Sequence, residues 1–576
     1  MPSETLISRI LPITNQFPPR TFRTDILAGV ALAGLLVPQG LAYAGIAGVP
    51  PQTGLIAALA GLLVYGLFGT SRQLAVSATS SSAAMLAALI APISQGDSAR
   101  YGVLASVATV AVGVVFLAGG LLRLGGVSEF ISKPVLKGFV FGLALTIMAK
   151  QAPKFMGVSA GKGNFFHQMW HVVTSLHEIN GWELVIAASA LAIMYLLGSV
   201  APRVPSALVV LVLGTAAVTC FNLSQHGVTV VGEMKAGVAT LSWPKIEEND
   251  LADLLAGSIG IVLVLMAEAL AAGRTFAAKH KYEIRPNQEL CALGLANLAS
   301  GLVGGIIVGG GMSGSAANDA GGARSQLASI TASISVALTF IYLLPAIRNL
   351  PEAVLAAIVV RAVAHLADVA TLRHYVKLRS GSIWVALIAL FAVLQMGILK
   401  GLVFAVGLTL IILMRKLSSP QDSVLGRLPG AEDFVDVARY PDANQVPGLL
   451  IFRPNGILFF ANANRVRDRI RELVRRPDTP VTTLILNLEA SPEIDVTSLE
   501  MLEQLTEELH AAGITVFFAR VADRVRDLFT HSGFLDRLGP DRFFKGVHAA
   551  VDAFLETEKD AIQIGTGARN KARAVS

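Results

Sequence analysis

LAVSATSSSAAM, at residues 74–85, interrupts a series of long apolar segments with a cluster of small and hydroxyl-bearing residues. It is too polar and too broken for an ordinary membrane span. A second broken stretch, at residues 306–322, reads IIVGGGMSGSAANDAGG. A pair of Gly- or Ser-interrupted segments at corresponding points of two halves indicates the binding site of a transporter. The two stretches therefore predict a membrane protein built from two related halves.

The two broken stretches lie at matching places along the chain. Ser80 follows Ile26, where the first apolar segment begins, at nearly the same spacing as Ser313 follows Ala256. With about seven spans in each half, the second half is inverted, because an odd number of crossings reverses the direction of the chain. The alternative is that Gly and Ser only allow helices to pack closely, as small residues often do in membranes. The matching positions favour the binding site.

The composition argues against every soluble class of protein. Of 576 residues, 53% are hydrophobic and only 15% are charged, whereas a soluble chain carries about 25% charged residues. Apolar runs recur from Ile26 to Leu417, and runs of about 18 residues or more can cross ~30 Å of hydrocarbon as helices. We expect a polytopic α-helical membrane protein with about 14 spans. An even number of spans leaves both termini on one side.

The net charge of +6 does not indicate a nucleic-acid partner. From Pro420 onward roughly 19 basic residues face 23 acidic ones, so the basic surplus belongs to the membrane part, as the positive-inside rule produces. Arg9, Arg20 and Arg23 precede the first apolar run and predict a cytoplasmic N-terminus in the inner or plasma membrane. With an even number of spans, the C-terminus is expected on the same side, with membrane lipid around the spans.

The chain divides into parts of different character. We expect a cytoplasmic N-terminal segment at 1–24, a transmembrane transport domain at 25–419, a linker at 420–440, an α/β domain at 441–557 and a flexible tail at 558–576. Within the α/β domain the pattern predicts two short strands around a Pro-Asn-Gly turn at 448–462, a helix at 499–510, and buried strands at 483–488 and 514–519. Strands alternating with helices indicate an α/β layer fold.

Several short motifs follow one another along the chain. They are DILAG from Asp25, VPQGLAYA from Val37, FGTSRQ from Phe68, SKPVLKGF from Ser132, GRTFA from Gly273 and NQEL from Asn287. In this order they resemble the motifs of the SulP (sulfate permease) family of anion transporters. The C-terminal region resembles the STAS domain of that family, and its EIDVTSLEML from Glu493 lies where STAS domains carry an Asp-Ser-Ser/Thr turn.

The resemblance implies an architecture and a class of substrate. It implies a 7+7 inverted repeat divided into core and gate bundles, in which each broken stretch begins as a short strand that meets a half-helix at mid-membrane. It also implies a homodimer with a cytoplasmic STAS domain that moves sulfate, bicarbonate, chloride or dicarboxylates. The protein is then a transporter and not an enzyme. It needs no cofactor and no metal.

A half-helix that starts inside the bilayer can hold an anion by itself. Its first N–H groups have no intrahelical partner, and its end carries roughly half a positive charge. Two such ends that face each other make an anion site without a cationic side chain. The hydroxyls beside them belong to Thr79, Ser80, Ser81, Ser313 and Ser315. Some of these hydroxyls are expected only to cap their own helices.

The resemblance places substrate contacts at Gln39, Tyr43, Ala78 and Ser313. Many relatives carry an arginine after that serine, whereas this chain has Gly314. Helix ends contribute up to ~2 kcal/mol each in favourable geometry, which suits a monovalent anion better than bare sulfate. The expected substrate-binding residues are Gln39, Tyr43, Ala78, Thr79, Ser80, Ser313, Gly314 and Ser315.

Glu268 is an acidic residue deep inside an apolar segment. It lies 12 residues after Ala256, about 18 Å along a helix. A carboxylate at such a depth is costly and indicates a functional residue, and the resemblance implies that Glu at this place couples transport to protons. The alternatives are a structural salt bridge, for example to Arg274, or a neutral hydrogen-bonded acid.

The resulting functional hypothesis is a proton-coupled symporter of a small inorganic oxyanion, with sulfate as the first candidate, that works by alternating access. Bicarbonate, chloride or C4-dicarboxylate transport, an anion channel, and a sensor with the STAS domain as its output are the alternatives. In the STAS region, Thr497 and Ser498 occupy a turn that some bacterial STAS proteins phosphorylate; Thr497 ahead of Glu500 also fits a helix cap. The glycines near Gly309 lack the Lys-Ser/Thr of a Walker motif.

Overall fold

The computed structural model describes residues 21–126, 132–161, 163–201, 204–232, 248–342, 348–364, 366–378, 381–418, 422–475 and 480–559. The expected N-terminal segment and C-terminal tail therefore lie almost entirely outside the described residues. The chain divides into two compact units, Met1–Thr409 and Leu410–Ser576.

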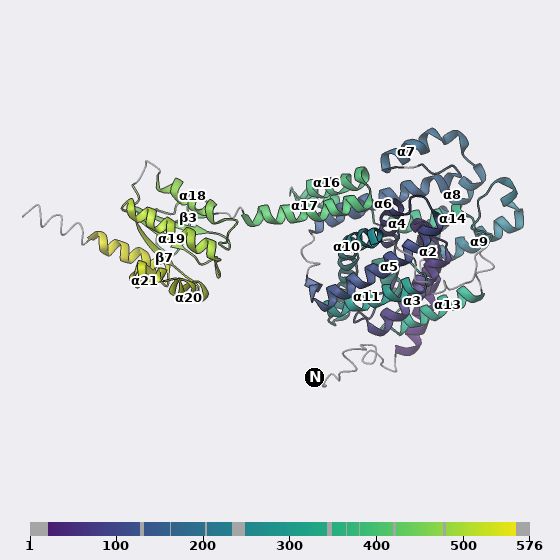
Figure 1. The fold of residues 1–576 in the computed structure, drawn as a ribbon, viewed down its shortest axis with the longest axis horizontal. Coiled ribbons are helices and arrows are strands. Elements are labelled where there is room, and N and C mark those ends of the chain that lie inside the picture. Colours follow the sequence, from purple (N-terminus) through teal and green to yellow (C-terminus); the bar gives the residue numbers. More distant parts are fainter. Residues whose placement is uncertain are drawn as a thin grey trace, which may run out of the picture. The chain divides into compact units, whose positions relative to one another are not determined.

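The first unit is built mainly of helices (Figure 1). In chain order they are α2 (Phe22–Ala47), α3 (Gln52–Phe68), α4 (Ser80–Ser94), α5 (Ser98–Leu121), α6 (Lys133–Met156), α7 (Phe165–Thr174), α8 (Gly181–Val200), α9 (Ser206–Phe221), α10 (Glu248–His280), α11 (Pro286–Leu302), α12 (Met312–Ala320), α13 (Leu327–Tyr342), α14 (Glu352–Ala364), α15 (Val369–Lys377) and α16 (Ser382–Met396). The next helix, α17 (Ile398–Ser418), runs across the boundary between the units.

The lengths and composition of these helices agree with a membrane domain. Among the described residues, seven stretches are long and apolar enough to cross a membrane: Phe22–Ala47, Ser98–Leu121, Lys133–Met156, Gly181–Val200, Asp250–His280, Glu352–Lys377 and Lys400–Ser418. Shorter apolar helices of 10–17 residues are α3, α4, α9, α13 and α16. The expected number of about 14 crossings stays a prediction.

Helices of the first unit approach closely where glycines face a neighbouring backbone. A Cβ added to Gly54 of α3 would lie 1.9 Å from the carbonyl oxygen of Gly40 in α2. Between α5 and α11, a Cβ on Gly113 would lie 2.8 Å from the backbone nitrogen of Leu298. Because lipid tails are as apolar as leucine, helices in membranes associate through such close packing of small residues.

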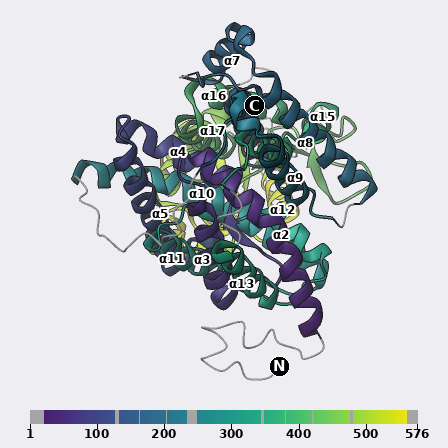
Figure 2. The ribbon, with the colours of Figure 1, turned by 90° about the vertical axis from the view of Figure 1, so that its right-hand side faces the viewer.

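Two short strands pair inside this helical unit. β1 (Val76–Ala78) runs antiparallel to β2 (Val308–Gly310), with Ser77 opposite Gly309 at the centre. Each strand is followed by one capping residue and then by a helix, α4 after β1 and α12 after β2. The broken stretches that the sequence singled out therefore form one antiparallel pair, as two inverted halves require. Both views show α4 and α10 in the interior (Figures 1 and 2), where they pack against each other.

Side chains complete the hydrogen bonding of this strand pair. The Asn297 amide nitrogen donates to the carbonyl oxygen of Val308 at 2.9 Å, and its oxygen accepts from the Val308 N–H at 2.9 Å. The Ala75 N–H donates to the Ser315 hydroxyl at 3.1 Å, and the Ser82 hydroxyl donates to the Ile307 carbonyl at 2.9 Å. Buried backbone groups need partners, and these side chains supply them where the strands end.

The second unit contains a six-stranded sheet in the order β4-β3-β5-β6-β7-β8. Strands β5, β6, β7 and β8 run parallel to one another, while β3 runs antiparallel to both β4 and β5. The strands are β3 (Asp422–Arg427), β4 (Phe434–Asp436), β5 (Leu449–Pro454), β6 (Thr483–Asn487), β7 (Thr515–Ala519) and β8 (Phe543–Phe544). The helices include α18 (Ala463–Val474), α19 (Val496–Ala511), α20 (Asp523–His531) and α21 (Phe534–Leu538), and residues 547–559 form a further helix.

Alternating side chains of β5 belong to two different cores, because successive residues of a strand point to opposite faces. Leu450 and Phe452 join the core that includes Ile470 of α18. Leu449 and Ile451 join the core formed with C-terminal residues, among them Val547, Val551 and Phe554. The sheet is therefore covered on both faces, which explains its almost wholly apolar central strands.

The structure differs from the sequence-based expectation at two places in this unit. Strands β3 and β4 lie within 420–440, where we expected a linker. Only one strand, β5, forms within 448–462, so the expected hairpin is wrong. The reason is that β5 is flanked by β3 and β6, which leaves no free edge for a hairpin partner.

Candidate functional site

The first residues of α4 and α12 lie close together. Thr79 caps α4 and Gly311 caps α12. A Cβ added to Gly311 would lie 3.2 Å from the Cγ2 methyl of Thr79. We call residues 79–82 and 311–314 the paired helix starts. Two positive helix ends in contact form the arrangement that favours an anion.

The two helix starts are capped differently. At α4 the Thr79 hydroxyl accepts from the Ser82 N–H at 3.0 Å, and the Ser82 hydroxyl accepts from the Thr79 N–H at 2.9 Å. At α12 the cap is a glycine, and no side chain there accepts a hydrogen bond from the first turn. The N–H groups of Met312, Ser313 and Gly314 are therefore left for a ligand.

The predicted hydroxyls fall into two groups. Thr79 and Ser315 have structural partners: Thr79 caps α4, and Ser315 donates to the Gly311 carbonyl at 2.7 Å while it accepts from Ala75. Ser80 is buried and Ser313 is half-buried, and neither hydroxyl has a hydrogen-bond partner within the described part of the chain. The second group is free to bind a ligand.

Gln39 and Tyr43 lie one turn apart on α2, which packs against α4, β1 and α12. Their side chains are 7% and 5% exposed, and neither makes a side-chain hydrogen bond to any residue that the structure describes. Buried polar groups are normally paired. The polar atoms of Gln39 and Tyr43 are not among the fully buried unpaired atoms, so a polar ligand can reach both of them on the same face of one helix.

Ala78 and Gly314 have packing neighbours. Ala78 ends β1 opposite Val308 and is buried. A Cβ added to Gly314 would lie 3.4 Å from the Cβ of Ala75 and 3.6 Å from Cδ2 of Leu36. A methyl group therefore fits there in ordinary contact. The paired helix starts hold no cationic side chain.

Glu268 of α10 is bound to the start of α4. The Ser81 hydroxyl donates to Oε2 of Glu268 at 2.8 Å, and the hydroxyls of Thr79 and Ser81 are 3.1 Å apart. Among the described residues Glu268 forms no ion pair, so the alternative of a salt bridge to Arg274 is not found. The sequence grouped Ser81 with the other hydroxyls but did not indicate that it binds this carboxylate.

Helices α10 and α12 are joined near their C-terminal ends. Lys279 and His280, at the end of α10, contact the carboxylate of Asp319 in α12 at 2.6 Å and 2.5 Å. The Ser81 bond joins α4 to α10, and the Asp319 contacts join α10 to α12, so α10 connects the other two helices.

Two buried carboxylates explain three of the sequence motifs. Glu289 of NQEL accepts from the Tyr65 hydroxyl at 2.5 Å and from the Thr70 N–H, in FGTSRQ, at 2.7 Å. Asp25 of DILAG accepts from the Arg324 N–H at 2.6 Å and from the Ser325 hydroxyl at 2.7 Å. These contacts fasten loops between helices and were missed by the sequence reasoning. The available signal was an isolated acid at the start of an apolar segment.

The start of α19 in the second unit corrects one expectation. Asp495, not Thr497, is its N-cap and accepts from the Ser498 N–H at 2.9 Å and the Ser498 hydroxyl at 2.6 Å. It also accepts from the Phe460 N–H at 2.7 Å. Burial alone would raise the pKa of Asp495, but these hydrogen bonds lower it below its usual value. Thr497 is exposed and Ser498 is buried.

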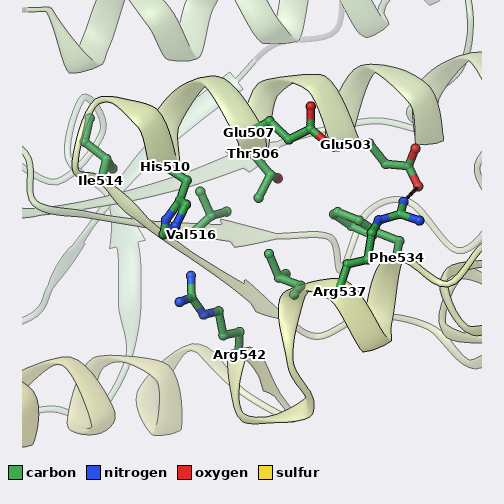
Figure 3. A pocket seen from close by; sticks show the side chains of 10 residues that line it. Glu503, Thr506, Glu507, His510, Ile514, Val516, Phe534, Arg537 and Arg542 are labelled. Atoms are coloured by element: carbon green, nitrogen blue, oxygen red, sulfur yellow. Dashed lines mark hydrogen bonds and ion pairs between the residues drawn. The ribbon is translucent and has the colours of Figure 1, made fainter.

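A cavity of about 260 Å³ also lies in the second unit, between α19, β7 and α21 (Figure 3). Ile514, Val516 and Phe534 form part of its apolar lining. The Glu503–Arg537 ion pair lies on its wall, with His510 and Arg542 facing each other across it. None of the predicted substrate-binding residues lines it.

Comparison with known proteins agrees with this geometry. The sequence profile described as the Sulfate permease family matches residues 22–389. The chain belongs to the sulfate permease family. The profile of the STAS domain matches residues 440–550, so the second unit contains a STAS domain.

Curated relatives extend over nearly the whole permease. "Probable sulfate transporter Rv1739c" of Mycobacterium tuberculosis is 36% identical over 94% of this chain and 96% of its own. "Sulfate transporter 1.3" of Arabidopsis thaliana is 29% identical over 93% of this chain and 85% of its own.

Two solved structures share the fold. The murine solute carrier 26 family member A9 anion transporter, in an inward-facing state, matches with a TM-score of 0.87 at 21% identity and covers 96% of this chain and 95% of its own. The transmembrane domain of the cyanobacterial bicarbonate transporter BicA matches with a TM-score of 0.61 at 24% identity over 68% of this chain and 99% of its own. The protein is therefore an integral membrane protein with a transporter-like helical domain and a C-terminal STAS domain.

Proposed function

We propose that this permease is a secondary active transporter that carries a small inorganic oxyanion, sulfate first, together with a proton. The observation that carries the proposal is the contact between Thr79 and Gly311, which brings the N-termini of α4 and α12 together. The unpaired side chains of Gln39 and Tyr43 on α2 support it independently. The names of the curated relatives support sulfate as the first candidate.

The anion is held by backbone dipoles and neutral donors. The uncapped N–H groups of 312–314 face it from α12, with the hydroxyls of Ser80 and Ser313 beside them. Gln39 donates from its amide and Tyr43 from its phenol. Hydrogen bonds to a charged group are stronger than neutral ones, so several preorganised donors replace the hydration that the anion loses.

Glu268 carries the coupling proton. A proton on Glu268 removes one negative charge near the anion, which offsets the missing arginine at Gly314. Loading of the anion and of the proton therefore favour each other. Without the arginine, a monovalent anion such as bicarbonate or chloride is the alternative substrate, and the space at Gly314 also leaves a C4-dicarboxylate as an alternative.

The contacts among α4, α10 and α12 suggest how the site moves. Because α4, α10 and α12 are linked by Ser81–Glu268 and by Asp319, we expect them to move as one body that exposes the anion to one membrane face and then to the other. This is alternating access. We further propose that both termini are cytoplasmic in the cell membrane, and that the protein is a homodimer in the lipid bilayer.

The test is uptake of radiolabelled sulfate into proteoliposomes. Wild-type protein should take up sulfate faster when protons are more concentrated outside, and Glu268→Gln should lose this proton-driven uptake while it keeps sulfate exchange. Glu432→Gln, at an exposed position of the second unit, is the matched control. Competition with unlabelled bicarbonate, chloride and fumarate ranks the alternative substrates.

Two results would contradict the proposal. Fully pH-driven uptake by Glu268→Gln would remove the coupling role of this residue. Steady currents that reverse at the Nernst potential of the anion, without proton movement, would indicate an anion channel.

A further inference from the structure

We propose that Thr79 and Ser81 form a hydroxyl relay through which protonation of Glu268 changes what the paired helix starts offer to an anion. The relay deepens the proposed proton symport and rests on it. Ser81 and Thr79 act in it as positioning residues, because they transmit the state of Glu268 to the anion.

The hydrogens of the relay have one possible order when Glu268 is ionised. A carboxylate only accepts hydrogen bonds, so Ser81 donates its hydrogen to Oε2 of Glu268, 2.8 Å away. Ser81 then has no hydrogen left for Thr79, and the 3.1 Å contact between the two hydroxyls requires Thr79 to be the donor. Both hydroxyl hydrogens are thus directed toward the carboxylate.

Thr79 has a second constraint from its capping role. Its hydroxyl oxygen accepts from the Ser82 N–H at 3.0 Å in addition to donating to Ser81. A hydroxyl has one donor and two acceptor positions, so one lone pair of Thr79 remains. Thr79 is half-buried and its methyl group contacts the cap of α12. When Glu268 is ionised, the Thr79 hydroxyl therefore presents a lone pair, and not a hydrogen, to an anion at the paired helix starts.

Protonation of Glu268 reverses the order. The added proton forms an O–H bond on Oε2, which donates to the Ser81 oxygen. The Ser81 hydrogen rotates about the Cβ–Oγ bond toward Thr79, and the Thr79 hydrogen is released toward the anion. No other covalent bond is made or broken. Thr79 still accepts from Ser82, so the cap of α4 is unchanged, but it now offers a donor where it offered a lone pair.

Other charges do not provide a competing explanation among the described residues. The elements packed against α10 are α4, α5, α11, α12 and β2. Neither α4 nor β2 carries a charged residue. Among the titratable and charged groups of the other elements, and of α10 near them, Arg100 is paired with Asp250, Tyr101 with the Ala47 carbonyl, Glu289 with Tyr65 and Thr70, and Asp319 with Lys279 and His280. The others are Cys291 of α11 and Asp253 and Arg274 of α10, and none of these three forms a hydrogen bond or ion pair with Glu268.

The predicted consequence is a pH-dependent affinity. Replacing a lone pair by a donor at one position should tighten sulfate binding by about tenfold or more when Glu268 is protonated, because hydrogen bonds to charged groups are among the stronger ones. The gain passes through Ser81, since no other side chain that the structure describes contacts Glu268 by a hydrogen bond.

The test is equilibrium binding of radiolabelled sulfate to purified full-length protein over a pH series. For wild-type protein the Kd should fall by about tenfold as the pH is lowered. Ser81→Ala should abolish the pH dependence, because the Thr79 hydroxyl then has no Ser81 partner and can donate to the anion at every pH. Ser81→Thr, which restores the hydroxyl, should recover the pH dependence. Ser329→Ala is the matched control, because Ser329 is a buried serine of α13 whose hydroxyl has no partner in the described chain.

A second measurement, on wild-type protein, detects the protonated Glu268 directly and so does not depend on how well the variants fold. Infrared difference spectra on addition of sulfate at acidic pH should show a protonated carboxyl band that disappears in Glu268→Gln. In Ser81→Ala this band should shift because the acid loses its hydroxyl partner.

The outcomes separate the relay from the proposed function. If wild-type uptake is coupled to protons but Ser81→Ala keeps the same pH dependence of binding, the relay is overturned and the symport stays in place. Wild-type protein without any pH dependence overturns the symport, and the relay with it.

Discussion

Thr79 and Gly311, which cap α4 and α12 from the two halves of the membrane domain, lie so close that a Cβ on Gly311 would be 3.2 Å from the methyl group of Thr79. Thr79 directly follows β1 and Gly311 directly follows β2, and the two strands are paired antiparallel. The same threonine is in contact with Ser81, which binds Glu268. The proposed anion site and the proposed proton site are thus two hydrogen bonds apart.

The glycine at the α12 cap should be required for anion binding. In Gly311→Val the added methyl groups would press on Thr79 and cover the uncapped N–H groups of the first turn. We expect sulfate affinity to fall by at least about tenfold, roughly 1.4 kcal/mol, with little change in folding. Gly102→Val in α5, where a Cβ meets nothing within 4 Å, is the control. Equal affinity in both variants would show that the anion binds elsewhere.

The unpaired polar side chains of α2 should contribute directly to affinity. Tyr43→Phe removes only a hydroxyl, and Gln39→Ala removes an amide that has no described protein partner. Each change should weaken sulfate binding by about 10- to 100-fold, since a hydrogen bond to a charged group is worth about 1.5–3 kcal/mol. Thermal stability should stay the same or rise, because no intramolecular hydrogen bond is lost. A fall in stability with unchanged affinity would assign both residues to the fold.

Close packing of α2 on α3 should determine the stability of the membrane unit. Gly54→Ala would place a Cβ 1.9 Å from the Gly40 carbonyl oxygen, so the helices must separate. We expect a loss of several degrees in thermal stability in detergent or no folded protein, in line with the ~1–3 kcal/mol or more that overpacking costs. Gly102→Ala, in open space, should be neutral or slightly stabilising. Equal melting temperatures would contradict the tight contact.

The Asp495 cap should give the STAS domain an acid-sensitive helix start. Hydrogen bonds lower the pKa of Asp495 in the folded state, so its stabilisation is fully present above the unfolded pKa of about 3.9 and is lost as the pH falls through the lower folded value. Asp495→Ala should remove ~1 kcal/mol near neutral pH. Amide exchange of residues 496–499 in the full-length protein measures this. If exchange there were the same in wild-type and variant at pH 7, Asp495 would not act as the cap.

The membrane architecture could be read from the sequence because its signals are local. The broken stretches at 74–85 and 306–322 were visible in the sequence as small and hydroxyl-bearing residues in an apolar background, whereas the strand and half-helix within each were implied by the resemblance to the SulP family. The C-terminal α/β pattern likewise predicted β6, α19 and β7. Strands β3 and β4 were not predicted, because their residues carry no clear alternation and β3 pairs with β5, which lies farther along the chain.

The partners of side chains could not be predicted. The sequence shows that Ser81 and Glu268 exist but not that they meet, since 187 residues separate them. It shows Glu289 in a motif but not that Tyr65 and Thr70 bind it. Such long-range contacts depend on how helices pack, and packing is a property of the whole fold.

The most direct measurement of the central claim is the position of a bound anion. A crystal or electron microscopy structure of the full-length protein with selenate, a sulfate analogue located by the anomalous scattering of selenium in crystals, would give it. We predict one peak beside Thr79 and Gly311, within hydrogen-bonding distance of the Ser313 N–H and close to Gln39 and Tyr43. An ordered anion in a transport-competent protein that contacts neither helix start would contradict it.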